Sequence, residues 1–180
     1  MKQKQLLLIS LFSALIIVGA YLRIPLPPVP ITLQTLFVLL AGVLLGTKAA
    51  ISSTAIYLLL GAIGLPVFSS GGGLALLLGP TGGYLFGLLF AAGLAGIAGN
   101  YKKKEEKPKM YSLLCLLFCF LATLAVYAVG VPFLKYSRSL SWKTAIEVGM
   151  IPFLLGDGLK IVAAVYLSRN LRSRIKEFLG

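Results

Sequence analysis

Six apolar runs, each about 17–25 residues long, follow one another along the 180-residue chain. They lie at about residues 5–22, 31–47, 49–65, 80–99, 110–134 and 147–168. An α-helix of this length crosses the hydrocarbon core of a bilayer. Charged residues make up only 12% of the chain, against roughly 25% in soluble domains, which is too few to cover a soluble core. The sequence therefore predicts an all-α integral membrane protein, a six-transmembrane-helix bundle.

The distribution of basic residues predicts how this bundle is oriented. Of the 17 Lys and Arg residues, 12 fall on the side that holds the N-terminus, four on the opposite side, and Lys160 within a run. Cytoplasmic loops carry an excess of Lys and Arg, so we expect both termini and the charged loop near residues 100–110 in the cytoplasm. That loop joins the fourth and fifth helices, and residues 1–180 are expected to form a single membrane domain.

The formal net charge of +12 would suggest nucleic-acid binding in a soluble chain. Here the basic residues lie mostly between apolar runs, so we expect them to meet the anionic headgroups of the lipid bilayer and no nucleic acid. The chain contains no histidine, which excludes Ser-His-Asp and Cys-His catalysis and removes the commonest nitrogen ligand of metals. We therefore predict no enzymatic activity, no cofactor and no metal site.

Two connections are predicted to be structured. RIPLPPVPIT, at residues 23–32, carries four prolines, which favour a stiff, extended path. GLPVFSSGGGLALLLGPTGGY, at residues 64–84, is too apolar for a water-exposed loop and too rich in glycine for a continuous helix. We expect it to form a structured glycine-rich outer loop between helices 3 and 4, packed on the mouth of the bundle.

The stretch FLLGDGLKIVAAV, at residues 153–165, places Asp157 and Lys160 inside an apolar run. Each charge costs roughly 2.5–3.5 kcal/mol at the centre of a spanning helix. Their i, i+3 spacing puts both on one helix face, where they either neutralise each other as an internal ion pair or share a polar ligand. A continuous helix entering the membrane at Glu147 would carry Asp157 about 15 Å deep, near the middle of the bilayer.

The fourth run begins with GPTGGY, and every fourth position from 79 to 99 is small. Such a ladder lets two helices approach closely in lipid. Around Gly82, backbone amides at the start of this helix could attract an anionic group of a ligand, or the glycines could serve only a turn and close packing. In PITLQTL, near the outer end of the second run, Gln34 could bind a ligand or hydrogen-bond a neighbouring helix.

Three stretches form a specific set: RIPLPPVPITLQTLFVLLAGVLLG at 23–46, GLPVF with GGGLALLLGPTGGYLFG within 64–87, and FLLGDGLKIVAA at 153–164. As a set they resemble the BioY family, the membrane-embedded substrate-binding (S) components of biotin transporters of the energy-coupling factor (ECF) type. The resemblance implies a bundle that binds biotin in an outward-facing cavity and mediates its uptake. It also implies a coupling transmembrane protein and two cytoplasmic ATPase subunits as partners, and the plasma membrane of a bacterium or archaeon as location.

The resemblance implies that Asp157 and Lys160 contact the ligand. Biotin combines a ureido group, an apolar thioether ring and a carboxylate tail. We expect Asp157 to accept from a ureido N–H, and Lys160 to donate to the ureido oxygen or the carboxylate. Tyr84 or Phe68 is expected to cover the ring. Gln34 is a further candidate contact, and the amides near Gly82 are a second candidate for the carboxylate.

Other functions stay open at this point. An intramembrane enzyme would use Ser69, Ser70 or Lys160, with the lysine as a base. A structural or channel-like bundle would use the Asp157–Lys160 pair only as an internal clamp. A transporter of a related vitamin would share the architecture but not the ligand.

Overall fold

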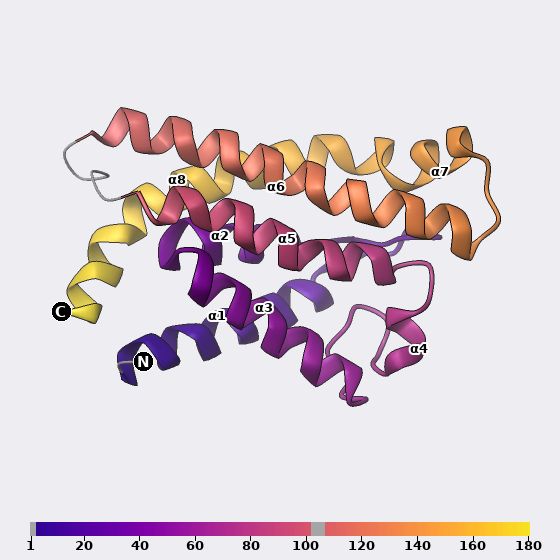
Figure 1. Ribbon diagram of the computed structural model, residues 1–180, viewed down its shortest axis with the longest axis horizontal. Coiled ribbons are helices and arrows are strands. Elements are labelled where there is room, and N and C mark those ends of the chain that lie inside the picture. The colour runs from indigo at the N-terminus through magenta and orange to yellow at the C-terminus, as the bar shows by residue number, and fades with distance from the viewer. Residues whose placement is uncertain (1–2, 102–106) are drawn as a thin grey trace.

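The protein, described by a computed structural model over residues 3–101 and 107–180, is a bundle of helices packed side by side (Figure 1). The helices are α1 Gln3–Tyr21, α2 Gln34–Leu45, α3 Thr47–Ala62, α4 Leu74–Leu77, α5 Gly82–Gly99, α6 Pro108–Ser137, α7 Trp142–Gly149, the 3-10 helix η1 Ile151–Phe153, and α8 Leu154–Leu179. Two short strands, β1 Arg23–Ile24 and β2 Ile31–Thr32, pair antiparallel. The prediction of an all-helical chain therefore holds except for this one small hairpin.

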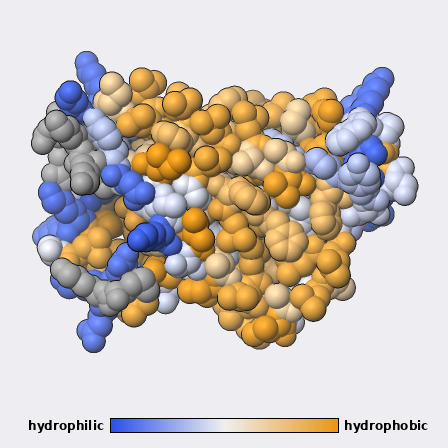
Figure 2. Space-filling view, in the orientation of Figure 1, coloured by the Kyte–Doolittle hydropathy of each residue, from blue (hydrophilic) through white to orange (hydrophobic). Residues whose placement is uncertain are grey.

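Four helical stretches of the described chain are long and apolar enough to cross a membrane: α1, α5, α6 and the stretch Trp142–Leu179. On the face shown in Figure 2, mostly hydrophobic residues cover the middle of the molecule, and hydrophilic residues gather at its two ends. On α8 the polarity is inverted relative to a soluble helix. Leu155 and Leu159 are 81% and 67% exposed, whereas Asp157 is 7% exposed. Such an arrangement suits a bundle surrounded by lipid.

Two of the six predicted runs differ from the helices observed. In the run predicted over 31–47, residues 31 and 32 form β2, and α2 begins only at Gln34 and has 12 residues. The run predicted over 147–168 is interrupted, because α7 ends at Gly149 and η1 contains Pro152, which lacks a backbone N–H and fixes φ. The depth calculated for a continuous helix from Glu147 is therefore wrong. Asp157 instead lies in the first turn of α8.

The ladder of small residues makes α5 the helix on which α2, α3 and α6 pack. A side-chain carbon at Gly87 would lie 2.8 Å from the Cα of Val126 on α6. At the other end of α5, such a carbon at Gly99 would lie 2.9 Å from the backbone N of Gly46, at the turn between α2 and α3. The predicted close approach of helices is confirmed. The small residues of α5 allow α6 to approach at Gly87 and the turn between α2 and α3 to approach at Gly99.

Both termini lie at one end of the bundle, and α4 and α7 lie at the other (Figure 1). The segment between α3 and α5 contains α4 and a short bridge between Phe68 and Gly71. Gly71 and Gly73 have φ values of 124° and 99°, which favour glycine because it has no Cβ. The backbone N–H of Gly73 donates to the carbonyl of Gly61 at 2.7 Å, which ties the segment to the end of α3.

Candidate functional site

A cavity lies between α2, α5, α6 and α8, bordered by the β1–β2 connection and by the glycine-rich segment between α3 and α5. Its polar lining residues are Thr32, Gln34, Thr35, Ser69, Ser70, Thr81, Tyr84, Tyr127, Asp157 and Lys160. Its apolar lining residues are Val29, Pro30, Phe68, Leu76, Leu85, Leu88, Val126 and Phe153. A cavity in which polar groups converge among apolar side chains is typical of a small-molecule site.

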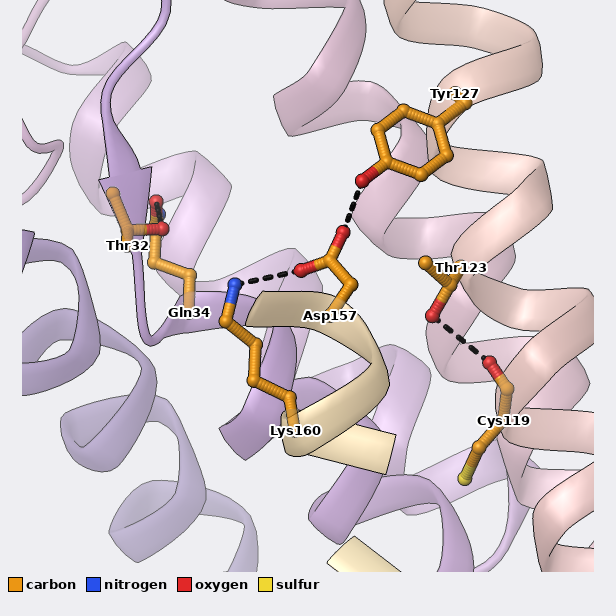
Figure 3. A network of polar contacts seen from close by, with 7 residues as sticks. All are labelled: Thr32, Gln34, Cys119, Thr123, Tyr127, Asp157 and Lys160. Carbon is orange, nitrogen blue, oxygen red and sulfur yellow. Dashed lines mark hydrogen bonds and ion pairs between the residues drawn. The ribbon is translucent and has the colours of Figure 1, made fainter. Parts of the chain in front are cut away.

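Asp157 and Lys160 form a buried ion pair on this wall (Figure 3). The Lys160 Nζ donates to the Asp157 Oδ1 at 2.7 Å, which confirms the predicted placement on one helix face. The hydroxyl of Tyr127 on α6 donates to the other carboxylate oxygen, Oδ2. Each carboxylate oxygen thus has a protein partner, and the lone pairs that remain can accept from a ligand.

The start of α8 favours this carboxylate. Asp157 lies in the first turn of α8, where the helix dipole favours a negative charge. Lys160 follows one turn later and supplies the opposite charge. Burial of an ion is costly without such compensation. The helix dipole and Lys160, both local to α8, and Tyr127 from α6 therefore all stabilise one buried anion.

Gln34 is held at both ends of its amide. Its Oε1 accepts from the Thr32 hydroxyl at 2.9 Å, and its Nε2 donates to the hydroxyl of Tyr57 on α3. In Figure 3, Thr32 and Gln34 lie on one side of the Asp157–Lys160 pair, and Tyr127 of α6 lies on the other side. Gln34 thus lies on the cavity wall and also bonds a neighbouring helix, so both predicted roles are geometrically compatible.

Tyr84 and Gly82 differ in their relation to the cavity. The Tyr84 ring lines it, and its hydroxyl donates to the carbonyl of Gly149, at the end of α7, at 2.8 Å. The ring packs on Gly130 of α6, where any side chain would collide with it. Gly82 is buried but is not among the lining residues, and its N–H donates to the carbonyl of Gly79 at 2.9 Å. A ligand contact at Gly82 stays a prediction.

Phe68 connects the glycine-rich segment to the cavity wall. It is 2% exposed and lines the cavity. Its ring packs edge-on against Tyr57, with ring centroids 5.4 Å apart, and fills the space left by the absent side chain of Gly61. Tyr57 in turn bonds Gln34, so the segment, α3 and the polar wall form one packed unit.

Several site residues were missed by the sequence analysis. Tyr127, Val29 and Phe153 all line the cavity, and Tyr127 bonds Asp157 directly. Tyr127 interrupts an apolar run with a hydroxyl that must find a partner inside the membrane. That signal could have marked Tyr127 as a site residue, but its partner, 30 positions away, follows only from the packing of α6 on α8.

No group of three or more His, Cys, Asp or Glu residues that could hold a metal ion is found in the described parts of the chain, 3–101 and 107–180. The polar groups of the cavity are hydroxyls, an amide, a carboxylate and an ammonium. These groups suit hydrogen bonding to a polar organic ligand.

Comparison with known proteins identifies the family of the chain that forms this cavity. The profile of the BioY family matches residues 1–177. The chain belongs to the BioY family. Its relatives include the biotin transporter BioY of Thermotoga maritima, 42% identical over 94% of this chain and 96% of that protein. The probable biotin transporter BioY of Pyrococcus horikoshii is 38% identical over 96% of this chain and 98% of that protein.

The fold of the chain also agrees with its assignment to the BioY family. The fold matches the crystal structure at 2.1 Å of the S-component for biotin from an ECF-type ABC transporter, with a TM-score of 0.83 and 32% identity. The match covers 96% of this chain and 92% of that one. The BioY resemblance inferred from three sequence stretches is therefore confirmed. This BioY family member is a multi-pass membrane protein of a transporter family.

Proposed function

We propose that this protein is the substrate-binding subunit of a biotin uptake system and that it performs no bond-making chemistry. Its BioY relatives are named biotin transporters, and the solved structure that it matches is an S-component for biotin. The observation that carries the proposal is the buried Asp157–Lys160 pair, which lines the cavity while the apolar residues of α8 face outward.

The lining of the cavity suits both the polar ureido group and the apolar thioether ring of biotin. The free lone pairs of Asp157 accept from a ureido N–H, and the protons of Lys160 that do not bond Asp157 donate to the ureido oxygen. The ring of Tyr84, with Phe68 and Leu88, covers the apolar thioether ring. Gln34 offers a further polar contact, with its amide already fixed by Thr32 and Tyr57.

In the proposed topology six helices, namely α1, α2, α3, α5, α6 and α8, cross the plasma membrane as one domain. The position of both termini at one end of the bundle supports an even number of crossings (Figure 1). The predominance of basic residues near that end supports its cytoplasmic location. The glycine-rich segment, α4 and α7 then lie at the outer face, and the cavity opens outward.

A coupling membrane protein and two cytoplasmic ATPase subunits complete the proposed uptake system. The matched S-component belongs to an ECF-type ABC transporter, and the sequence of this chain holds no ATP-binding motif of the GxxxxGK[ST] type. ATP dependence would therefore come from other chains.

The first prediction tests the ligand and the two charged contacts together. The purified protein in detergent should bind radiolabelled biotin, and Asp157→Asn and Lys160→Ala should each weaken binding by at least about tenfold, because each removes a charged hydrogen-bond partner. Lys143→Ala, at an exposed residue of α7 outside the cavity, serves as the control and should leave binding unchanged. Unchanged affinity in both cavity variants would refute the assignment of Asp157 and Lys160 as ligand contacts.

A further inference from the structure

An arginine lies at the edge of the cavity without an anionic partner. Arg23, the first residue of β1, is exposed, and its Nη1 lies 3.4 Å from the Oγ of Ser70. Within the described chain this long contact is the only hydrogen bond found for the guanidinium, and no carboxylate pairs with it. A guanidinium has five donors and commonly binds carboxylates through two of them.

Strand pairing directs this arginine toward the cavity. Arg23 is directly opposite Thr32 in the antiparallel hairpin, and residues directly opposite each other project from the same face of a pair of strands. Thr32 lines the cavity, and so does Ser70, the residue that Arg23 contacts. Arg23 thus stands between two lining residues that come from the two connections bordering the cavity.

The charges on the cavity wall leave an anionic ligand without a counterion. Among the described lining residues, Asp157 and Lys160 are the only charged ones. They bond each other at 2.7 Å and neutralise each other. A carboxylate that entered the cavity would meet no uncompensated positive charge on the wall, whereas Arg23 offers one at its edge.

We propose that Arg23 forms the carboxylate subsite of the cavity, binding the acidic tail of the ligand while its ureido head lies at Asp157 and Lys160. This inference rests on the proposed function, since it takes the ligand to be a carboxylic acid with a polar head at the other end. The guanidinium contacts Ser70 only weakly, and binding of the ligand replaces part of the guanidinium's hydration with the two carboxylate oxygens.

The second prediction uses two ligands that differ only at the tail: biotin and its neutral carboxamide. The wild-type protein should bind biotin more tightly than the amide. Arg23→Gln should weaken biotin binding roughly five- to twentyfold, a range reduced by the exposure of the site, and should leave binding of the amide unchanged. Arg23→Lys keeps the charge but lacks the pair of parallel N–H donors of a guanidinium. Its affinity for biotin should therefore lie between those of the wild-type protein and Arg23→Gln.

The control is Arg138→Gln. Arg138 is an exposed guanidinium directly after α6 and outside the cavity, so its loss removes the same charge without touching the proposed subsite. It should preserve the preference for biotin over the amide. Both affinities are measured by isothermal titration calorimetry, with thermal unfolding curves to verify that each variant is folded.

Three results would overturn the Arg23 subsite. These are an equal loss for both ligands in Arg23→Gln, no loss for either ligand, or a wild-type protein without preference for the acid. A wild-type protein that binds neither ligand would instead refute the proposed function itself. The two failures are therefore distinguishable in one set of titrations.

Discussion

The floor and the mouth of the cavity are built differently. At the floor, Asp157, Lys160 and Gln34 are buried, and each has short bonds to other side chains. At the mouth, Arg23 and Ser70 are exposed and share one contact of 3.4 Å. A buried group bonded to neighbouring side chains is held in one orientation, whereas an exposed arginine keeps its rotamer freedom. The floor is therefore held more rigidly than the mouth.

The largest effect is expected at the floor, where the two charges depend on each other. Lys160→Met would leave Asp157 buried without its counterion and should lower the free energy of unfolding by about 3 kcal/mol. The double variant Asp157→Leu/Lys160→Met should recover most of this stability, because apolar pairs replace buried ion pairs at little cost. Unfolding in detergent micelles, followed by circular dichroism, measures both.

Binding by the same double variant separates function from stability. The recovered protein should fold but should not bind biotin, because both polar contacts are gone. If it bound biotin with wild-type affinity, the pair would be an internal clamp only, as in a structural bundle.

A smaller effect is expected for Tyr127→Phe, which keeps the ring but removes the hydroxyl that bonds the Asp157 Oδ2. Loss of a hydrogen bond to a charged group should cost about 1.5–3 kcal/mol of stability. Biotin affinity should fall about tenfold if the hydroxyl orients the carboxylate for the ligand. The matched control is Tyr136→Phe, at an exposed tyrosine on the same helix. Equal, negligible changes in both variants would show that Tyr127 does not position Asp157.

The smallest effect is expected for Ser70, at the mouth of the cavity. Ser70→Ala removes the one long contact of Arg23, and an exposed position of this kind changes stability by less than about 0.5 kcal/mol. Biotin affinity should change less than about twofold, because the guanidinium remains. A loss as large as that of Tyr127→Phe, measured by the same titration, would show that the mouth is as rigidly organised as the floor.

The sequence predicted the Asp157–Lys160 pair because i, i+3 spacing on a helix is a local property. The close packing of α5 followed in the same way from its small residues. The interruption before α8 was missed, since Ile151 and Phe153 are apolar and conceal the effect of Pro152 on helix continuity. Strand β2 was missed for a similar reason, because the predicted apolar run that contains α2 begins at Ile31, the first residue of the strand.

The polar partners of the site were not predictable from spacing. Tyr127 reaches Asp157 across 30 residues, and Tyr57 reaches Gln34 across 23. These distances are set by how α6 packs on α8 and α3 on α2, which a single sequence does not specify. The position of Arg23 opposite Thr32 depended on a hairpin of two-residue strands, which is too short to leave a pattern.

The space that Gly61 leaves for Phe68 has a consequence for how such a chain can vary over evolution. Any side chain at this position would strike the Phe68 ring, which packs on Tyr57, whose hydroxyl bonds Gln34. A substitution at Gly61 would therefore disturb the cavity wall through two intervening rings. We expect selection for the ligand to preserve a glycine at this position, and random mutagenesis for lost uptake to recover Gly61 alongside the residues that line the cavity.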